Sequence, residues 1–419
     1  MDRPRVVGDD ITEKNTRGEL YMKTLSFNNR LKKNIKRNYV FTMIQNLDLT
    51  RGIWMIYLAS KGMSLTQLGL LETIFHITSF LMEVPTGAVA DIYGRRVSRI
   101  VGRFLSLTSV VILLLANSFV WFAISFVITA LSYNMESGAG DALIYDSLKE
   151  LDDESGFMRV SGNKEMIYQM AGIVSFMLGG YLATKNYDLA FLITIIVGTM
   201  SFGYSFLFVE PNVGRNINDQ SSRGHFLRQL KESVSVLKAH KRVMFLIIFS
   251  QLIMSFVTTV FYYLQNYMKS DGYSEIAIGT LYAVSALGGA LLAPQVYKIE
   301  AVIKERGILL YMPIVTTACL FGIAFSSLHF LFFIPMSLAE GLIFIALGDY
   351  INKVIPSEKR ATILSMASMV FSFFMITIFP VVGILGDAFG LAQAFLVMAI
   401  VATVLTIVNS ISLAHRVDQ

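Results

Sequence analysis

Residues 44–59 of this chain, IQNLDLTRGIWMIYLA, combine a mostly apolar composition with two opposite charges, Asp48 and Arg51. Three residues apart on a helix, these side chains would share one face. A charge inside a membrane is costly, so it usually faces a bundle interior or water and marks a functional site. We therefore expect Asp48 and Arg51 to bind a proton or a substrate. The alternative is a static ion pair that lines a polar cavity.

This spacing also suggests a chemistry. Burial raises the pKa of an aspartate, whereas a nearby arginine lowers it. A change of conformation that moves Arg51 would therefore change how tightly Asp48 holds a proton.

Other apolar stretches carry ionisable residues of the same kind. Glu72 and His76 lie four residues apart on one predicted helix face and could share a proton, because histidine titrates near neutrality. Glu136 and Glu340 lie near the middle of two further stretches, and Glu340 has no basic residue near it in the sequence. Such carboxylates bind protons or attract cations. A structural role is the alternative for each.

The composition indicates what surrounds these residues. The chain has 419 residues, of which 54% are hydrophobic and 16% charged, and its mean hydropathy is +0.58. Soluble proteins are about 25% charged. We therefore expect a polytopic membrane protein. Charges fill residues 1–38 and no short apolar core precedes a cleavage site, so we expect the first apolar segment to be retained as a span.

The apolar stretches are long enough to cross a bilayer, which takes about 20 residues. They lack the period-two alternation of a barrel, so they predict helices and an all-α membrane protein. Twelve spans are predicted, at residues 38–59, 66–90, 99–116, 119–145, 164–184, 189–209, 243–267, 275–297, 307–326, 329–351, 361–384 and 390–413.

Lysine and arginine predict the orientation of these spans. With twelve spans both termini share one side, and that side carries 30 of the 35 basic residues. The opposite loops carry Lys61, Lys185 and Lys269. Because basic loops stay in the cytoplasm, we expect a multi-pass protein of the cell membrane with both termini cytoplasmic.

Three sequence matches relate the first part of the chain to the second. The matches are G-x-S-x4-G at 62–69 and 272–279, Gly-Asp at 140–141 and 348–349, and Ala-Phe at 190–191 and 394–395. They predict two pseudo-symmetric six-helix halves, as in secondary transporters. The predicted parts are a cytoplasmic tail 1–37, a half 38–209, a linker 210–242 with an amphipathic helix near 226–237, a half 243–413 and a tail 414–419.

The segment TGAVADIYGRR, residues 86–96, joins the second and third predicted spans. It resembles the signature loop of the major facilitator superfamily, G-x-x-x-D-[RK]-x-G-[RK]-[RK]. Ile92 departs from that pattern, since it is apolar where a base is usual. The matching residues are Gly87, Asp91, Gly94, Arg95 and Arg96.

The resemblance implies the twelve-helix major facilitator fold and transport by alternating access. It also implies that Asp91 and Arg95 belong to a cytoplasmic latch that stabilises one conformation, with Asp146 or Asp141 as their partner. Arg103, near the cytoplasmic edge of its span, is expected to reach the interface or to pair with Asp146.

The fifth predicted span partly resembles a pattern of proton-coupled drug antiporters of that superfamily, G-x8-G-x3-G-P-x2-G-G. Gly162, Gly179 and Gly180 match it, and Ala171, Ser175 and Phe176 replace its middle Gly, Gly and Pro. Packing between helices explains most of the match, because small residues let helices approach closely.

These observations predict a proton-coupled secondary transporter. Buried acids outnumber buried bases, which favours export of a lipophilic or cationic compound, as in multidrug efflux by proton antiport. The alternatives are a proton-coupled importer of a small polar or anionic solute, which Arg51 would bind, a lipid flippase, or a membrane sensor that does not transport.

The sequence also argues against other classes of protein. It has no Gly-rich phosphate loop, which argues against ATP as the energy source, and no Cys/His metal spacing. No polar stretch is long enough for a catalytic domain, so we expect no enzyme, cofactor or metal. The expected partners are a small-molecule substrate, protons and the bilayer, with no nucleic acid, and the expected state is a monomer.

Overall fold

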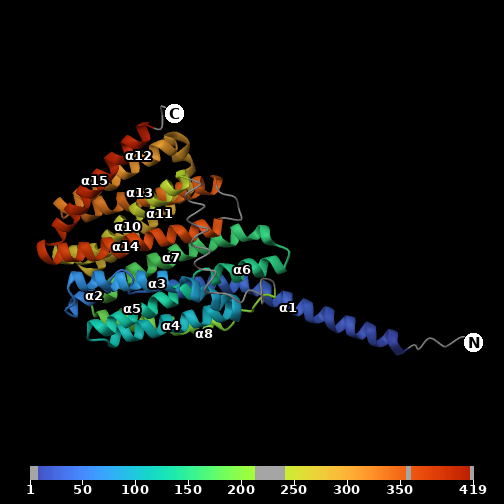
Figure 1. The fold of residues 1–419 in the computed structure, drawn as a ribbon. Coiled ribbons are helices and arrows are strands. Elements are labelled where there is room, and N and C mark those ends of the chain that lie inside the picture. The colour runs from blue at the N-terminus through green and yellow to red at the C-terminus, as the bar shows by residue number, and fades with distance from the viewer. Residues whose placement is uncertain (1–7, 213–240, 355–359, 416–419) are drawn as a thin grey trace, which may run out of the picture.

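The structure is a computed structural model that describes residues 8–212, 241–354 and 360–415. All regular elements in these ranges are helices, arranged in two groups side by side (Figure 1). The first group comprises α1 (Gly8–Asn46), α2 (Trp54–Ser60), α3 (Leu65–Tyr93), α4 (Arg95–Leu115), α5 (Phe119–Glu136), α6 (Ala139–Glu150), η1 (Glu154–Gly156), α7 (Phe157–Ala183) and α8 (Tyr187–Ser205). The second comprises α10 (Lys241–Ser270), α11 (Glu275–Leu292), η2 (Ala293–Gln295), α12 (Val296–Phe325), α13 (His329–Val354), α14 (Arg360–Phe389) and α15 (Leu391–His415).

The described helices confirm the prediction of an all-α membrane protein. Ten helical stretches in the described ranges are long and apolar enough to cross a membrane. One of them, Glu275–Phe325, contains both α11 and α12, and the first predicted span is divided between α1 and α2. The count of twelve spans therefore stays a prediction, which these two observations support.

Two predicted spans are interrupted. The first is helical only to Asn46, and residues 47–53 are non-helical before α2 begins. The fourth is divided between α5 and α6, where Gly138 has a φ of +74°. In the predicted N-terminal tail, residues 8–37 are part of α1, which projects beyond the bundle (Figure 1). The predicted amphipathic helix 226–237 and most of the tail 414–419 lie outside the described residues.

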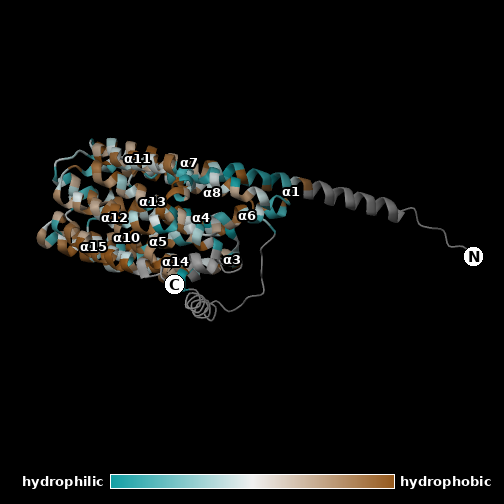
Figure 2. Ribbon diagram, turned by 90° about the horizontal axis from the view of Figure 1, so that it is seen from above, coloured by the Kyte–Doolittle hydropathy of each residue, from teal (hydrophilic) through white to brown (hydrophobic). Residues whose placement is uncertain are grey.

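The two ends of the bundle differ in polarity. We call the end that carries Arg95, Arg96 and Lys353, where α1 projects, the basic end, and the opposite end the far end. Figure 2 shows polar residues gathered near α6 and the adjoining part of α1, whereas hydrophobic residues predominate along α10, α12 and α15. This pattern suits helices that pass through lipid and leave it at the basic end.

At the far end the halves pack closely through glycines. A Cβ on Gly279 of α11 would lie 2.2 Å from the carbonyl oxygen of Phe176 on α7. A Cβ on Gly180 of α7 would lie 2.5 Å from the carbonyl oxygen of Glu275. Larger residues would force α7 and α11 apart. These glycines therefore allow backbone-to-backbone contact between the halves, as small residues do in membrane helices.

A second far-end contact joins α3 to α14. The Asp387 carboxylate accepts hydrogen bonds from the backbone N–H groups of Leu65, at 2.9 Å, and Thr66, at 2.8 Å. These N–H groups begin α3 and have no partner within the helix. The Tyr263 hydroxyl lies 3.1 Å from the Leu65 carbonyl oxygen, to which it donates. Asp387 thus caps a helix of the other half.

We predict that Asp387→Ala weakens the closure of the far end. Loss of a helix cap costs about 1 kcal/mol, which would shift a two-state equilibrium roughly fivefold toward separation of the halves. The measurement is the rate of maleimide labelling of Leu65→Cys in detergent, with Cys319→Ala as background. The rate should rise with Asp387→Ala, and less with Asp387→Asn, which keeps one acceptor oxygen. An unchanged rate would show that this cap does not hold the halves together.

Candidate functional site

The interruption of the first span is held by its own side chains and by two other helices. Asp48 Oδ1 accepts hydrogen bonds from Thr50 N, at 2.9 Å, and Thr50 Oγ1, at 2.6 Å. Such local bonds compete with helix formation. Leu49 N donates to Thr194 Oγ1 of α8 at 3.1 Å. A Cβ on Gly179 of α7 would lie 2.1 Å from the Leu49 carbonyl oxygen, so only glycine permits this approach.

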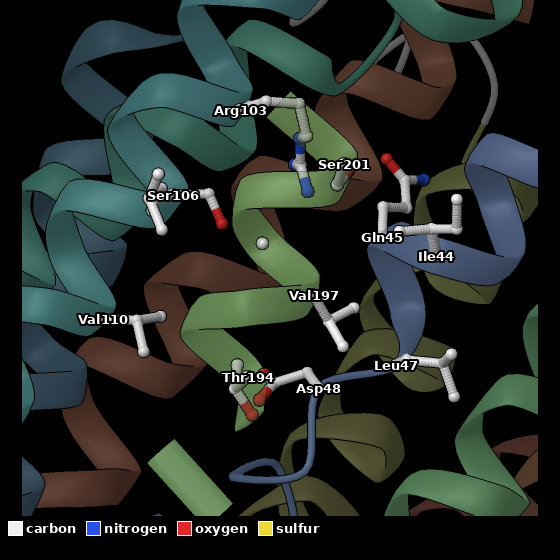
Figure 3. Close-up of a pocket in the computed structure, with 12 residues that line it drawn as sticks. Ile44, Gln45, Leu47, Asp48, Arg103, Ser106, Val110, Thr194, Val197 and Ser201 are labelled. Carbon is white, nitrogen blue, oxygen red and sulfur yellow. The ribbon is translucent and has the colours of Figure 1, made fainter. Parts of the chain in front are cut away.

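The expectation that Asp48 and Arg51 share a helix face is wrong, because residues 47–53 do not form a helix. Asp48 lines a pocket among α1, α4 and α8 (Figure 3). Arg51 contacts α7, where Nη2 donates to the Tyr168 hydroxyl at 2.6 Å. Its guanidinium carbon lies 5.2 Å from the Tyr168 ring centre and 5.6 Å from that of Phe176. In the described ranges no ion pair joins Asp48 and Arg51.

Arg51 lies near residues of both halves. Tyr262 of α10, in the second half, interacts electrostatically with Arg51 and with Glu72 of α3. The Tyr262 ring also packs against Trp54, at 5.5 Å between ring centres. Among the described residues Arg51 has no carboxylate within ion-pair distance. Its guanidinium is therefore a cation held by aromatic rings at the junction of the halves, with donors left for a ligand.

Glu72 and His76 lie together on α3, as their spacing predicts. Their nearest side-chain atoms, Glu72 Oε2 and His76 Nε2, are 3.9 Å apart, which is longer than a hydrogen bond. Each side chain is only 9% exposed. The His76 ring packs against Phe371 of α14 at 5.6 Å between ring centres. The pair thus borders the second half, and Glu72 shares Tyr262 as a neighbour with Arg51.

Aromatic rings pack together between these polar groups and the far end. Trp54 packs on Phe126 at 5.3 Å, and Tyr262 packs on Phe379 at 5.7 Å. The layer belongs to the largest buried apolar cluster and joins both halves. A second set of rings continues it around α7, α10, α11 and α13, namely Phe176, Phe261, Tyr282 and Phe333.

Glu136 and Glu340 have different surroundings. Glu136 ends α5 and pairs with Arg99 of α4, at 2.9 Å between Oε1 and Nη2. Arg99 is 2% exposed and lies between the rings of Phe41 and Phe208, at 4.3 and 4.4 Å. Glu340 has no hydrogen-bonding or ionic partner in the described parts of the chain. The structure therefore gives Glu136 a buried counter-charge, and it shows no such counter-charge for Glu340 among the described residues.

The loop between α3 and α4 forms a network at the basic end. Gly94 has a φ of +101°, a conformation that glycine adopts without strain. Arg95 forms an ion pair with Asp91 and lies 3.9 Å from Asp146. Arg96 Nη2 donates to the Phe206 carbonyl oxygen at 2.9 Å.

Three other residues that the sequence analysis singled out have surroundings at this end that differ from those expected. Asp141 pairs with Lys164 rather than with the loop. Arg103 lines the pocket with Asp48 and forms no ion pair with Asp146 in the described residues. A Cβ on Gly87 would meet no atom within 4 Å, so packing does not require glycine there in this conformation.

Comparison with known proteins agrees with this architecture. The sequence profile of the Major Facilitator Superfamily matches residues 41–376. The chain belongs to the major facilitator superfamily. It is 25% identical over 382 residues to the uncharacterized MFS-type transporter YxaM of Bacillus subtilis (strain 168), which covers 86% of this chain and 92% of that protein. The predicted family is thereby confirmed.

Solved structures share the fold at low sequence identity. The nucleoside transporter NupG matches with a TM-score of 0.75 and 12% identity over 91% of this chain and 98% of that one. A bacterial homolog of the human lysosomal transporter Spinster, inward-facing and unoccupied, gives 0.69 and 15% over 92% and 96%. A POT family transporter in complex with 5-aminolevulinic acid gives 0.68 and 12% over 91% and 95%.

The network at the basic end includes one residue that was not predicted from the sequence. Glu210 follows α8, and its carboxylate accepts hydrogen bonds from the backbone N–H groups of Arg95 and Arg96, both at 2.7 Å. A Cβ on Gly94 would lie 2.8 Å from the Glu210 carboxylate, so glycine makes room for this contact. The only signal was an acid before Pro211 at the end of a predicted span, which did not indicate a partner. Tyr168 and Tyr262 were missed because tyrosines are frequent in membrane helices.

We predict that Glu210→Ala destabilises the transporter by about 1–2 kcal/mol, because two N–H groups at the start of α4 lose their acceptor. The measurement is thermal unfolding in detergent. Glu210→Gln keeps one acceptor oxygen and should lose less. Equal melting temperatures for all three proteins would mean that water replaces the carboxylate at no cost.

Proposed function

We propose that this transporter moves a small organic solute with an anionic group, coupled to protons, and that Arg51 binds the anion. The main support for this proposal is the position of the Arg51 guanidinium at the junction of the halves. Its contacts there are a tyrosine hydroxyl and two aromatic rings. A guanidinium matches the geometry of a carboxylate or phosphate through paired hydrogen bonds.

The ion pairs and neighbours of the acids change which solute the protein is expected to carry. Export of a cation was favoured because buried acids outnumber buried bases. In the structure Glu136 is paired with Arg99, and Asp48 shares its pocket with Arg103. Among the described residues near the junction of the halves, Arg51 has no carboxylate within ion-pair distance, so an anionic group on the solute is the better match.

Alternating access is supported by the contrast between the two ends. Gly180 and Gly279 at the far end leave no room for a side chain, whereas a Cβ on Gly162 of α7 or Gly289 of α11 would meet no atom within 4 Å. The two helices thus touch at the far end, and the glycines that lie nearer the basic end face open space. We propose that the basic end faces the cytoplasm and that this conformation is inward-facing.

Glu72 and His76 are the proposed site at which protonation affects the solute. Glu72 shares Tyr262 as a neighbour with Arg51, so a change of charge at Glu72 would alter the electrostatic potential at the anion site. The structural neighbours that carry nucleosides or bind 5-aminolevulinic acid support small polar solutes as a class for this fold.

A second candidate is efflux of a lipophilic cation by proton antiport. Glu72 favours it, because this buried carboxylate has His76 as its ionic neighbour and lies near the aromatic residues Tyr262 and Tyr263. A lipophilic cation could pair with Glu72 and pack on the rings.

The test is transport in proteoliposomes with an internal pH dye and three panels: small carboxylates and phosphates, neutral polar solutes, and lipophilic cations. We predict that Arg51→Gln weakens binding of the transported anion roughly 10- to 100-fold, the value of a hydrogen bond to a charged group. Arg51→Lys should bind the anion with an affinity between those of the wild type and Arg51→Gln, since lysine keeps the positive charge but cannot form the paired hydrogen bonds of a guanidinium. Glu72→Gln, the matched control, should retain anion binding and lose coupled proton movement.

Other outcomes separate the alternatives. Transport of lipophilic cations alone, lost in Glu72→Gln and retained in Arg51→Gln, would replace the anion proposal with efflux. Movement of a labelled lipid between leaflets would favour a flippase. Failure to move any solute, lipid or proton would favour a sensor.

A further inference from the structure

A polar pocket lies inside the first half, apart from Arg51. It has a volume of about 60 Å³ and is lined by residues of α1, α4, α8 and the start of the interruption at residues 47–53. Figure 3 shows Arg103, Ser201 and Gln45 toward one end of the pocket and Asp48 with Thr194 at the other. The first group lies nearer the basic end, since Arg103 is two turns from the start of α4.

Three of the side chains that line this pocket each carry a buried atom without a hydrogen-bond partner in the described structure: Gln45 Oε1, Arg103 Nε and Ser201 Oγ. A buried polar group left unpaired costs about 1–3 kcal/mol. One buried water needs about 10–15 Å³, so the pocket has room for about four. Water both donates and accepts hydrogen bonds, and therefore suits a pocket that presents an acceptor, a donor and a hydroxyl.

We propose that this pocket is a water-filled proton site, through which a proton from the basic end reaches Asp48 inside the first half without passing the solute site at Arg51. The proposal rests on the proton coupling proposed above. The proton passes from a hydronium ion in the pocket to Asp48, forming an O–H bond and leaving water, and returns to water by the reverse step.

The charged groups around the pocket are few. Asp48 faces Arg103 across it, and interacts electrostatically with Arg51 and with Tyr262 of α10. From α8, Thr194 and Ser201 contribute hydroxyls. Arg103 in turn lies near Glu136 and Arg99, the buried pair of α4 and α5.

Protonation of Asp48 has a direct structural consequence. Its carboxylate accepts two hydrogen bonds from Thr50 that hold the turn at the end of α1. A protonated carboxyl is a weaker acceptor, so the turn loosens when the proton binds. Arg51 follows Thr50 in the chain. A proton taken up in the pocket therefore alters the position of the solute-binding guanidinium on the other side of the same segment.

The first experiment asks whether water fills the pocket. Ser106 and Ser109 are both on α4, but only Ser106 lines the pocket. With Cys319→Ala as background, the infrared S–H band of Ser106→Cys should exchange in D₂O several-fold faster than that of the matched control Ser109→Cys, because exchange of the thiol proton needs water and a water molecule is small enough to enter the pocket. Equal rates would overturn the assignment of water to the pocket.

The second experiment follows the proton at Asp48 without any solute. The infrared carboxylic-acid band that Asp48→Asn removes is recorded across a pH titration, and its shift is timed after H₂O is exchanged for D₂O. Gly198 lines the pocket, and a Cβ there would lie 3.5 Å from Leu107 Cδ1, an ordinary contact. Gly198→Leu should fill the pocket and slow the exchange several-fold. Gly203→Leu is the matched control on α8, because a Cβ there meets no atom within 4 Å.

The outcomes of these two experiments test the proposed proton route through the pocket, independently of the solute. Slower exchange in Gly198→Leu than in Gly203→Leu supports the route. Equal rates overturn it and place proton access to Asp48 elsewhere, and absence of an Asp48 band at every pH overturns Asp48 as a proton site. Because neither experiment uses a solute, a failure of the anion proposal would appear only in transport by the Arg51 variants.

Discussion

The bonds from Asp48 to Thr50 are the interaction on which the arrangement of the site depends. They end α1 in the middle of a span, where a continuous helix would satisfy every backbone group by itself. Interruption inside a membrane is tolerated only where other groups satisfy the freed backbone. Here Thr194 accepts from Leu49, and Ser175 donates to the Asn46 carbonyl oxygen at 3.1 Å. Helices α7 and α8 thus fix the course of the interrupted segment.

The interruption determines which neighbours each charge has. A helical segment would have placed Asp48 beside Arg51 as a neutral pair. The turn instead directs Asp48 into the pocket of the first half and Arg51 against Tyr168. Close packing at the far end then brings Tyr262 and the α3 pair near Arg51. Two neighbouring glycines of α7 allow both the interruption and the far-end contact. Gly179 leaves room for the Leu49 carbonyl oxygen, and Gly180 leaves room for the backbone of α11.

Features that depend on local composition, such as the spans and the family motif, could be predicted from the sequence. Contacts between residues far apart in the chain could not. Hydropathy and the loop from Gly87 to Arg96 were sufficient for the fold and the family, because spans and a contiguous motif are local. The interruption was missed because two hydrogen bonds that one aspartate accepts do not change the hydropathy of the segment. Glu136 was predicted as a site residue without its partner, because Arg99 lies 37 residues away on another helix. Glu210 was missed for the same reason, since it meets Arg95 from a distance of 115 residues in the chain.

The placement of Asp48 and Arg51 on opposite sides of one turn bears on how a proton and a solute can be coupled. If both bound in one cavity, each would compete with the other for water and for charge. In the proposed arrangement the two sites are separate, which removes that competition, and coupling then requires a connection that moves when either ligand binds. Residues 47–53 supply such a connection, because the bonds that define the turn end on the carboxylate itself. A ligand can shift an equilibrium only by its difference in affinity between two states. In our proposal the proton at Asp48 has such a difference, since a proton that weakens the turn binds more tightly where the bonds from Thr50 are already broken.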